Sequence, residues 1–509
     1  MRALAVAIVV LAVGGCTVVD TEWRGPMRLR FTGDPGLSEC VDALAEIRRG
    51  VAEAGTGDAE TAPIAGFPYL RINRFLARVG DSFDRAPVDS PAFEAWVDRL
   101  RALDARATRI ELANMPGDDR LRLELSLGRV TPAPVDIEVL VESCGDRLRA
   151  RDLADAGRRR QLLELARVPD DYSNLARIAG VYPLTSIAAS LGWDAWKDVN
   201  FASFQEPPAS LPVEGTIVDW VPDTDARPLS PSGVATIVDA SRDPHLGIPE
   251  PKGRDRRRLI ATFAPVWRVD VTAAHDRIGA PTWPAGGEGA EIDTGRPTTF
   301  TRIGHAFFEG QILLQVSYGV WFPERPRESE LDILAGHLDG IIWRVTIGAD
   351  GRPLVYDTIH QCGCYHLFFP AAPLRRRAIA DDMVFDEIAD VPTPAPRLEQ
   401  GQRMVLWLAT RSHYLVGLST VDDGEIDGAR YALADDNDLR SLPIPGGGRR
   451  SLFEADGLVA GTERMERFLL WPSGIASPGA MRQWGTHATA FVGRRHFDDP
   501  DLIGKAFER

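Results

Sequence analysis

The spacing of apolar residues changes once along this 509-residue chain, and that change constrains the fold more than any other feature. In the first part, segments rich in Ala, Leu, Arg and Glu place apolar residues every three or four positions, as amphipathic helices do. In the second part, β-branched and aromatic runs are separated by turn residues, which is typical of strands. The sequence therefore predicts an α+β fold, in which a mainly helical N-terminal domain precedes a larger β-rich domain with antiparallel hairpins.

These two patterns also set the expected boundaries. The helical pattern covers 37–54, 68–84, 91–112 and 135–167, with short strand-like pieces at Met27–Phe31 and Leu121–Leu127. The strand pattern covers 215–220, 259–271, 311–322, 338–347, 354–369 and 404–408. We expect a helical domain over 17–175, a connector over 176–204 and a β-rich domain over 205–509. The apolar stretch 172–204 favours a buried connector; the alternative is a flap that faces a membrane or a substrate.

Charge excludes one class of function. The formal net charge is −15, and basic and acidic residues are interspersed without a basic stripe that carries aromatic residues. The sequence therefore argues against nucleic-acid binding. The short runs Arg256–Arg258 and Arg375–Arg377 are interpreted as solvated faces.

The first sixteen residues have the layout of an export signal. Met1-Arg2 is followed by an apolar run over 3–13 and then by Val13-Gly14-Gly15-Cys16. A short basic start, an apolar stretch and small residues before a cleavage point are typical of a secretory signal peptide. The apolar run is too short to span a membrane, which needs about 20 apolar residues.

The Val13–Cys16 ending resembles the lipobox of bacterial lipoproteins. The resemblance implies cleavage before Cys16, diacylation of that cysteine and attachment of the mature chain to the cell envelope through lipid. Thr17 follows the cysteine where an inner-membrane lipoprotein tends to carry Asp, which implies the outer membrane. The alternative is an ordinary secretory signal in which the cysteine occurs by chance.

Four further cysteines need a role in an oxidising compartment. Cys40 and Cys144 each lie in a predicted helix, and we expect them to form a disulfide. Cys362 and Cys364 then remain as a Cys-Gly-Cys unit with another function.

The segment 356–369 concentrates the candidate chemistry. His360, Cys362, Cys364 and His366 fall at every second position, so one face of a strand would carry all four. Thiolates and imidazoles suit zinc or copper. All four cannot reach one ion unless the strand bends, and Gly363 is where a bend is permitted.

The preceding strand supplies two more candidates, His337 and Asp339. A hairpin with a two- or four-residue loop near Asp350-Gly351 would pair Ile347 with Leu354, Arg344 with Asp357, Ile341 with His360, Asp339 with Cys362 and His337 with Cys364. The opposite charges of Arg344 and Asp357 favour this register. A three-residue loop with a bulge at Gly351 would shift the pairing by one residue and separate Asp339 from the cysteines.

Three interpretations of this segment remain open. In the first, His337, His360, Cys362, Cys364 and His366 supply metal ligands, His305 and Glu309 neighbour the site, and Asp339 is the general base of a metal-dependent hydrolase. In the second, these are buried structural residues in a non-enzymatic binding or scaffold lipoprotein. In the third, the Cys-Gly-Cys pair is redox-active. The segment Gly336–Pro370 also resembles uncharacterised bacterial envelope proteins, which implies no chemistry.

Overall fold

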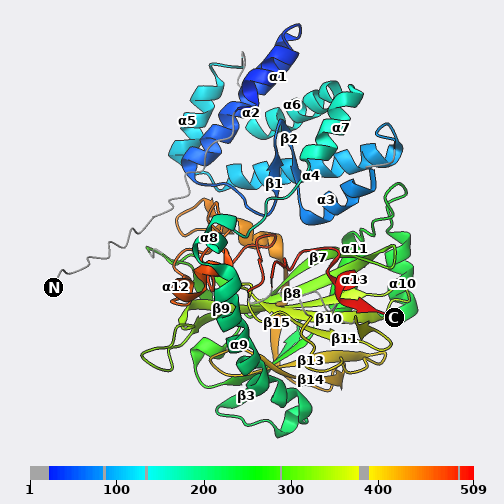
Figure 1. Cartoon of the computed structure of the whole chain (residues 1–509), viewed down its shortest axis with the longest axis vertical. Helices are drawn as coiled ribbons and strands as arrows, with labels where there is room; N and C mark the ends of the chain where they lie inside the picture. The colour runs from blue at the N-terminus through cyan, green and yellow to red at the C-terminus, as the bar shows by residue number, and fades with distance from the viewer. Residues whose placement is uncertain (1–21, 84–86, 132–135, 287–288, 378–388, 491–492) are drawn as a thin grey trace, which may run out of the picture.

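The computed structural model describes residues 22–83, 87–131, 136–286, 289–377, 389–490 and 493–509. It has the expected α+β organisation: a helical N-terminal region is followed by a larger region built on a mixed sheet with antiparallel hairpins (Figure 1). Among the described residues, no helix has the length and apolar character needed to cross a membrane.

The N-terminal region packs its helices around one short hairpin. The hairpin consists of β1 (Ala62–Ile64) and β2 (Phe67–Ile72). The helices are α1 (Arg24–Arg30), α2 (Pro35–Ala54), α3 (Arg74–Gly80), α4 (Pro91–Ala113), α5 (Gly117–Leu127), α6 (Ile137–Asp152) and α7 (Ala156–Leu165). Helix α2 begins where the Asp34 side chain accepts a hydrogen bond from the Leu37 N–H, and it ends at Gly55 in the left-handed conformation.

The predicted disulfide is present in this region. Cys40 of α2 and Cys144 of α6 are joined, with their Cα atoms 5.1 Å apart. The bond links two helices that also share one buried apolar core.

Three local expectations for the N-terminal region were wrong. Leu121–Leu127 is helical: its leucines alternate with polar residues as in a strand, but only Leu123 and Leu127, one helical turn apart, are buried. Met27–Phe31 lies mostly in α1. The predicted helix over 68–84 begins as strand β2, which is buried along its whole length, and becomes helical only at Arg74.

The β-rich region is organised by a ten-stranded sheet with the order β11-β10-β9-β8-β7-β15-β3-β4-β13-β14. Strands β7 to β11 form an antiparallel meander, whereas β15 pairs in parallel with both β7 and β3. The bounds are β3 (Thr216–Pro222), β4 (Val266–Val271), β7 (Thr298–Phe308), β8 (Gln311–Arg325), β9 (Gly336–Ile347), β10 (Pro353–His360), β11 (Leu367–Pro370), β13 (Gln402–Leu408), β14 (Leu415–Asp422) and β15 (Ala429–Asp435).

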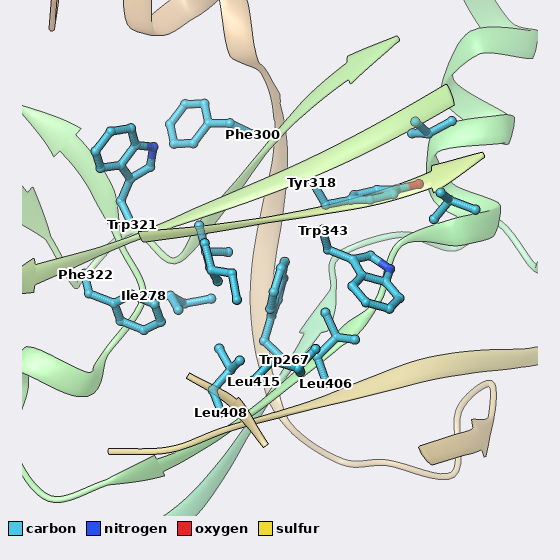
Figure 2. Close-up of a cluster of buried hydrophobic side chains, with 14 of the residues drawn as sticks. Trp267, Ile278, Phe300, Tyr318, Trp321, Phe322, Trp343, Leu406, Leu408 and Leu415 are labelled. Carbon is cyan, nitrogen blue, oxygen red and sulfur yellow. The ribbon is translucent and has the colours of Figure 1, made fainter. Parts of the chain in front are cut away.

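The sheet curls around its own core. Trp343 of β9 and Leu406 of β13 are far apart in the strand order, yet both belong to one buried cluster. Figure 2 shows Trp267, Tyr318 and Trp321 among the large side chains of this interior. The core of the β-rich region therefore lies on the inner face of the curled sheet.

Smaller elements complete this region. The additional helices are α10 (Pro231–Ala240), α11 (Gly253–Phe263), α12 (Arg467–Leu470) and α13 (Leu502–Ala506). The short strands are β5 (Ala280–Thr282), β6 (Glu291–Asp293), β12 (Arg375–Arg376), β16 (Leu442–Pro443), β17 (Arg449–Arg450) and β18 (Phe507–Glu508). The predicted strand over 259–271 is helical up to Phe263, at the end of α11, before β4 begins.

The connector between the two regions is helical. It forms α8 (Asn174–Ala179) and α9 (Tyr182–Asn200). Its inner side packs against the β-rich region: Trp193 donates a hydrogen bond to Asp390, and the tilted ring of Trp196 contacts that of Tyr365. Its outer side is exposed, so the interpretation of 172–204 as a buried connector holds for one face only.

Candidate functional site

The hairpin of β9 and β10 carries most of the candidate residues. Its pairing has the predicted register over Tyr356–His360: Arg344 lies opposite Asp357, and Ile341 lies opposite His360. At the tip the competing register holds, with Ile347 opposite Pro353 rather than Leu354. A bulge between Pro353 and Val355 absorbs the difference of one residue and restores the predicted pairing.

The predicted pairing fails beyond His360, because the chain turns there. The His360 N–H donates to the Cys364 carbonyl and the Gly363 N–H donates to the His360 carbonyl. Gly363 has φ +87°, and a Cβ there would lie 2.6 Å from the Ala488 carbonyl oxygen, so the turn requires glycine. Strand β11 then returns beside β10. The expected pairs of Asp339 with Cys362 and of His337 with Cys364 are therefore wrong.

His366 was also expected on the face of His360, and this was wrong. Its Nε2 lies 2.9 Å from Asp357 Oδ2. Asp357 and His360 are three residues apart on one strand, so their side chains point to opposite faces of the sheet. His366 thus belongs to the outer face, with Arg344 and Asp357, because the turn reverses the chain before it.

Asp339 is the centre of a buried polar cluster on the inner side. Its side chain is 0% exposed. His413 donates from Nδ1 to Asp339 Oδ2 at 2.8 Å, and Arg464 donates to Oδ1 at 3.2 Å. His360 Nδ1 lies 3.7 Å from the same Oδ1. The sequence alone gives no signal for His413 as a partner of Asp339, because 74 residues separate the two.

A second carboxylate holds His413 from its other side. His413 Nε2 lies 3.4 Å from Asp276 Oδ1, and the ring stacks on Phe322 with centroids 3.8 Å apart. Asp276 also accepts hydrogen bonds from Thr272, Thr410 and the Arg411 N–H. The histidine is therefore fixed in position and orientation by Asp339, Asp276 and Phe322, which come from three separate segments.

Charges within this cluster balance each other. Burial raises the pKa of Asp339, but Arg464, the nearby His360 ring and the hydrogen bond from His413 together lower it well below its usual value. Burial lowers the pKa of His413, but Asp276 and Asp339 raise it above the usual value. Burial lowers the pKa of His360. Asp339 is therefore an ion-paired carboxylate and a weak proton acceptor, which suits it poorly to general-base catalysis.

Cys362 and Cys364 are buried free thiols beside this cluster. A hydrogen bond between the two sulfurs lowers the pKa of Cys362 and raises that of Cys364. Arg482 donates to the Cys362 carbonyl at 3.1 Å and thereby fixes the turn. Neither thiol is exposed to solvent, which limits its reactivity.

The remaining candidates lie apart from these groups. His337 is exposed at the start of β9 and bonds through Nε2 to the Ala290 carbonyl at 2.7 Å. His305 bonds to the Pro249 carbonyl and stacks on Phe75, and Glu309 pairs with Arg509. Within the described ranges, no group of three or more His, Cys, Asp or Glu side chains is arranged to hold a metal ion. Cys16 lies outside the described residues.

A cleft between the helical and β-rich regions is open to solvent and is lined by charged side chains. It encloses about 1020 Å³ between α4 and the segments around Asp243, Lys252 and His305. Its charged lining consists of Arg99, Arg106, Arg109, Lys252, Arg256 and Arg302 with Asp98, Asp243, Glu250 and Asp435. Cations therefore outnumber carboxylates in the cleft, although the chain as a whole is acidic.

Ion pairs neutralise the carboxylates of this cleft. Asp243 and Glu250 both pair with Arg99. Asp98 pairs with Arg149, and Asp435 pairs with Arg256. By contrast, Arg106 and Lys252 make neither an ion pair nor a side-chain hydrogen bond with any residue that the structure describes. Sequence reasoning missed both, because their nearness depends on how the two regions pack.

No family model, curated protein or solved structure matches the chain.

Proposed function

We propose that this chain is a lipid-anchored, non-enzymatic protein of the cell envelope that binds an anionic ligand in the cleft between its two regions. The observation that carries the proposal is the contrast between its two polar sites. The Asp339 cluster is sealed and its charges are internally compensated, whereas Arg106 and Lys252 lie in an open cleft without partners among the described residues.

Several features argue against the Asp339 cluster as a hydrolytic site. A metal-dependent hydrolase needs a coordination position that water and substrate can reach. Both oxygens of Asp339 already accept hydrogen bonds from Arg464 and His413. His366 is directed to the other face of the sheet, and His337 bonds to the Ala290 carbonyl. This cluster is better suited to holding the curled sheet together.

The chemistry of the cleft selects the class of ligand. Two cations that form no ion pair with the described residues lie in this concave surface and attract phosphate or carboxylate groups, and Arg106 can bind either in a bidentate manner. Envelope polymers that carry phosphate or carboxylate groups are within reach of an anchored protein. The ligand class is therefore an anionic polymer or its fragments.

Isothermal titration with a phosphate-bearing polymer tests the cleft. The Arg106→Gln/Lys252→Gln variant should bind at least about 10-fold more weakly than the wild type, because each lost charge-assisted bond contributes on the order of 1.5 kcal/mol. The matched control is Arg122→Gln/Arg160→Gln, in which both substitutions lie on the helical region outside the cleft lining. Equal affinity of the two variants would remove the cleft as the binding site.

The lipid anchor has its own test. Cys16→Ser should prevent acylation and release the protein from the membrane fraction, and labelling with a radioactive or clickable fatty acid measures this directly. Outer-membrane fractionation of the wild-type protein tests the position implied by Thr17. Normal acylation of the Cys16→Ser variant would contradict the anchor and leave the cleft proposal intact.

Elemental analysis decides between this proposal and a metalloprotein. The protein purified without chelator should contain no stoichiometric zinc or copper. If zinc or copper is present at one atom per chain and is lost in His360→Ala, the metal-site interpretation replaces the one proposed here.

A further inference from the structure

One surface of the molecule carries an unusual concentration of exposed apolar side chains. It is formed by α8, the first half of α9, and the segment of α12 and the turn after it. The large apolar residues that it exposes are Leu175, Ile178, Val181, Leu184, Ile187, Leu191, Met465, Phe468, Leu469 and Trp471. We call this the α8–α9–α12 surface. Large apolar patches exposed to water mark sites of contact with another apolar phase.

The helices of this surface contact one another, so the patch is continuous. Both α8 and α9 contact the turn over Trp471–Ser473, which continues α12. Figure 1 shows α8 beside α12, with α9 running down the outside of the β-rich region. On α9, Leu184, Ile187 and Leu191 follow helical spacing and are 67%, 52% and 66% exposed.

The opposite face of α9 is already occupied. Trp193 and Trp196 pack over Tyr365, with ring centroids 5.9 and 4.8 Å away. The outer leucines therefore cannot turn inward without displacing this packing. They form a fixed apolar face that is presented to the surroundings.

Charged groups are nearly absent from this face. Residues 172–193 contain one charged side chain, Arg177. Its guanidinium donates to the carbonyls of Ser473 and Gly493 and lies 3.8 Å above the Tyr182 ring. Arg464 and Glu466, on the α12 side, are buried. On the α12 side, the only charged side chains that residues 463–475 expose are Glu463 and, partly, Arg467, so the apolar face carries few exposed charges.

We infer that the α8–α9–α12 surface inserts into the lipid bilayer to which the chain is anchored. The choice of a bilayer as the occupant rests on the proposed anchor at Cys16. Five residues, Thr17–Thr21, separate Cys16 from the first described residue, so the tether spans about 20 Å at most. The bilayer is therefore present at high effective concentration near the folded part. Short helices with an apolar face and aromatic residues such as Phe468 and Trp471 are typical of interfacial insertion.

Flotation with vesicles of phosphatidylethanolamine and phosphatidylglycerol tests this inference independently of the anchor. The protein used begins at Thr17, keeps every described residue and lacks the lipid. It should float with the vesicles. Leu184→Glu/Leu191→Glu should reduce vesicle partition at least about 100-fold, because each substitution removes the favourable free energy of transferring a leucine side chain from water into lipid. The matched control, Leu121→Glu/Leu125→Glu, changes two exposed leucines of α5 in the N-terminal region, outside the α8–α9–α12 surface, and should float like the parent chain.

Other outcomes overturn the inference. Failure of the parent chain to float, or equal flotation of the two variants, removes the bilayer as the occupant. Loss of a dimer in the Leu184→Glu/Leu191→Glu variant, seen by light scattering without a change in flotation, assigns the surface to a second copy of the chain. The protein used for flotation lacks Cys16, so its binding to vesicles does not depend on the outcome of the acylation test.

Discussion

The Arg344 guanidinium and the Asp357 carboxylate form a doubly hydrogen-bonded ion pair across β9 and β10, at 3.0 and 2.6 Å, with both side chains almost fully buried. Arg344 also donates to the Phe497 carbonyl and lies 3.8 Å above the Phe497 ring. The pair therefore fixes the hairpin register and attaches the C-terminal segment to the outer face of the sheet.

Removal of one member of this pair should destabilise the protein strongly. Arg344→Met leaves the Asp357 carboxylate buried without its main partner, and such losses cost about 3–5 kcal/mol. Urea unfolding measures the change. The double variant Arg344→Met/Asp357→Leu should recover much of the loss, because no buried charge remains.

The exposed pair of Arg109 and Glu142 provides the matched control. Solvent screens this pair, so Arg109→Met should change the free energy of unfolding by less than about 1 kcal/mol. Similar losses for Arg344→Met and Arg109→Met would contradict the structural role assigned to the buried pair.

His366 should make stability depend on pH. Burial lowers its pKa to about 4, although the hydrogen bond to Asp357 opposes this effect. In the unfolded chain the histidine pKa is about 6.5, so between pH 6.5 and pH 4 His366 is protonated in the unfolded chain but neutral in the folded one. Stability is therefore full above pH 6.5 and falls as the pH drops from 6.5 towards 4, by about 2 kcal/mol at pH 5.

Urea unfolding at pH 7.5 and pH 5 for wild type and His366→Gln measures this term. The variant lacks the titrating group and should lose about 2 kcal/mol less between the two pH values. His245→Gln, in an exposed loop, serves as the control. Parallel pH dependence in wild type and His366→Gln would rule out His366 as the source.

Loss of the Cys40–Cys144 disulfide should lower stability through the unfolded state. The bond spans 104 residues, and closing a loop of that size contributes about 4.7 kcal/mol in the chain-entropy model. Thermal unfolding of Cys40→Ala/Cys144→Ala checks the magnitude. Alkylation of the denatured wild-type chain that begins at Thr17, followed by mass spectrometry, should find two free thiols, Cys362 and Cys364. Four labelled thiols would contradict the pairing.

The parts of the fold that follow from local periodicity were predictable from the sequence. The hairpin register over Tyr356–His360 was correct because the opposite charges of Arg344 and Asp357 indicated that pairing, whereas the expected loop length was wrong by one residue at the tip. Leu121–Leu127 was wrong because two of its four leucines are exposed, so the alternation does not reflect burial. Local patterns fail where exposed apolar residues imitate a strand.

The candidate site was harder to predict, because its contacts join distant segments. The turn at Gly363 reverses the chain and separates His366 from His360, although the spacing of the ligands suggested one face. Asp339 meets His413 and Arg464 only through the curl of the sheet. No local pattern encodes that curl, which arises from the order of strands far apart in sequence.

The helical and β-rich regions should unfold together, because buried ion pairs join them. Arg440 donates to both oxygens of Asp58 at 2.9 and 2.6 Å, and Arg302 pairs with Glu60. Burial raises the pKa of Glu60, but Arg302 and Arg440 lower it to about 2. The buried charges of Asp58 and Glu60 in the helical region are therefore compensated by arginines of the β-rich region.

Arg440→Met should uncouple the two regions. Asp58 and Glu60 then remain buried with less positive charge nearby, which costs about 3–5 kcal/mol of stability. The loss weakens the interface between the regions rather than either core. Circular dichroism at 222 nm reports mainly on the helical region. Tryptophan fluorescence reports mainly on the rest, since ten of the twelve tryptophans follow residue 190. In the wild type the two probes should give one coincident urea transition, whereas in Arg440→Met the midpoints should separate.

Arg78→Met is the control. It breaks the partly exposed pair with Asp501, which also joins the regions, and should leave the transitions coincident. Coincident transitions in Arg440→Met at an unchanged midpoint would show that apolar contacts alone hold the regions together.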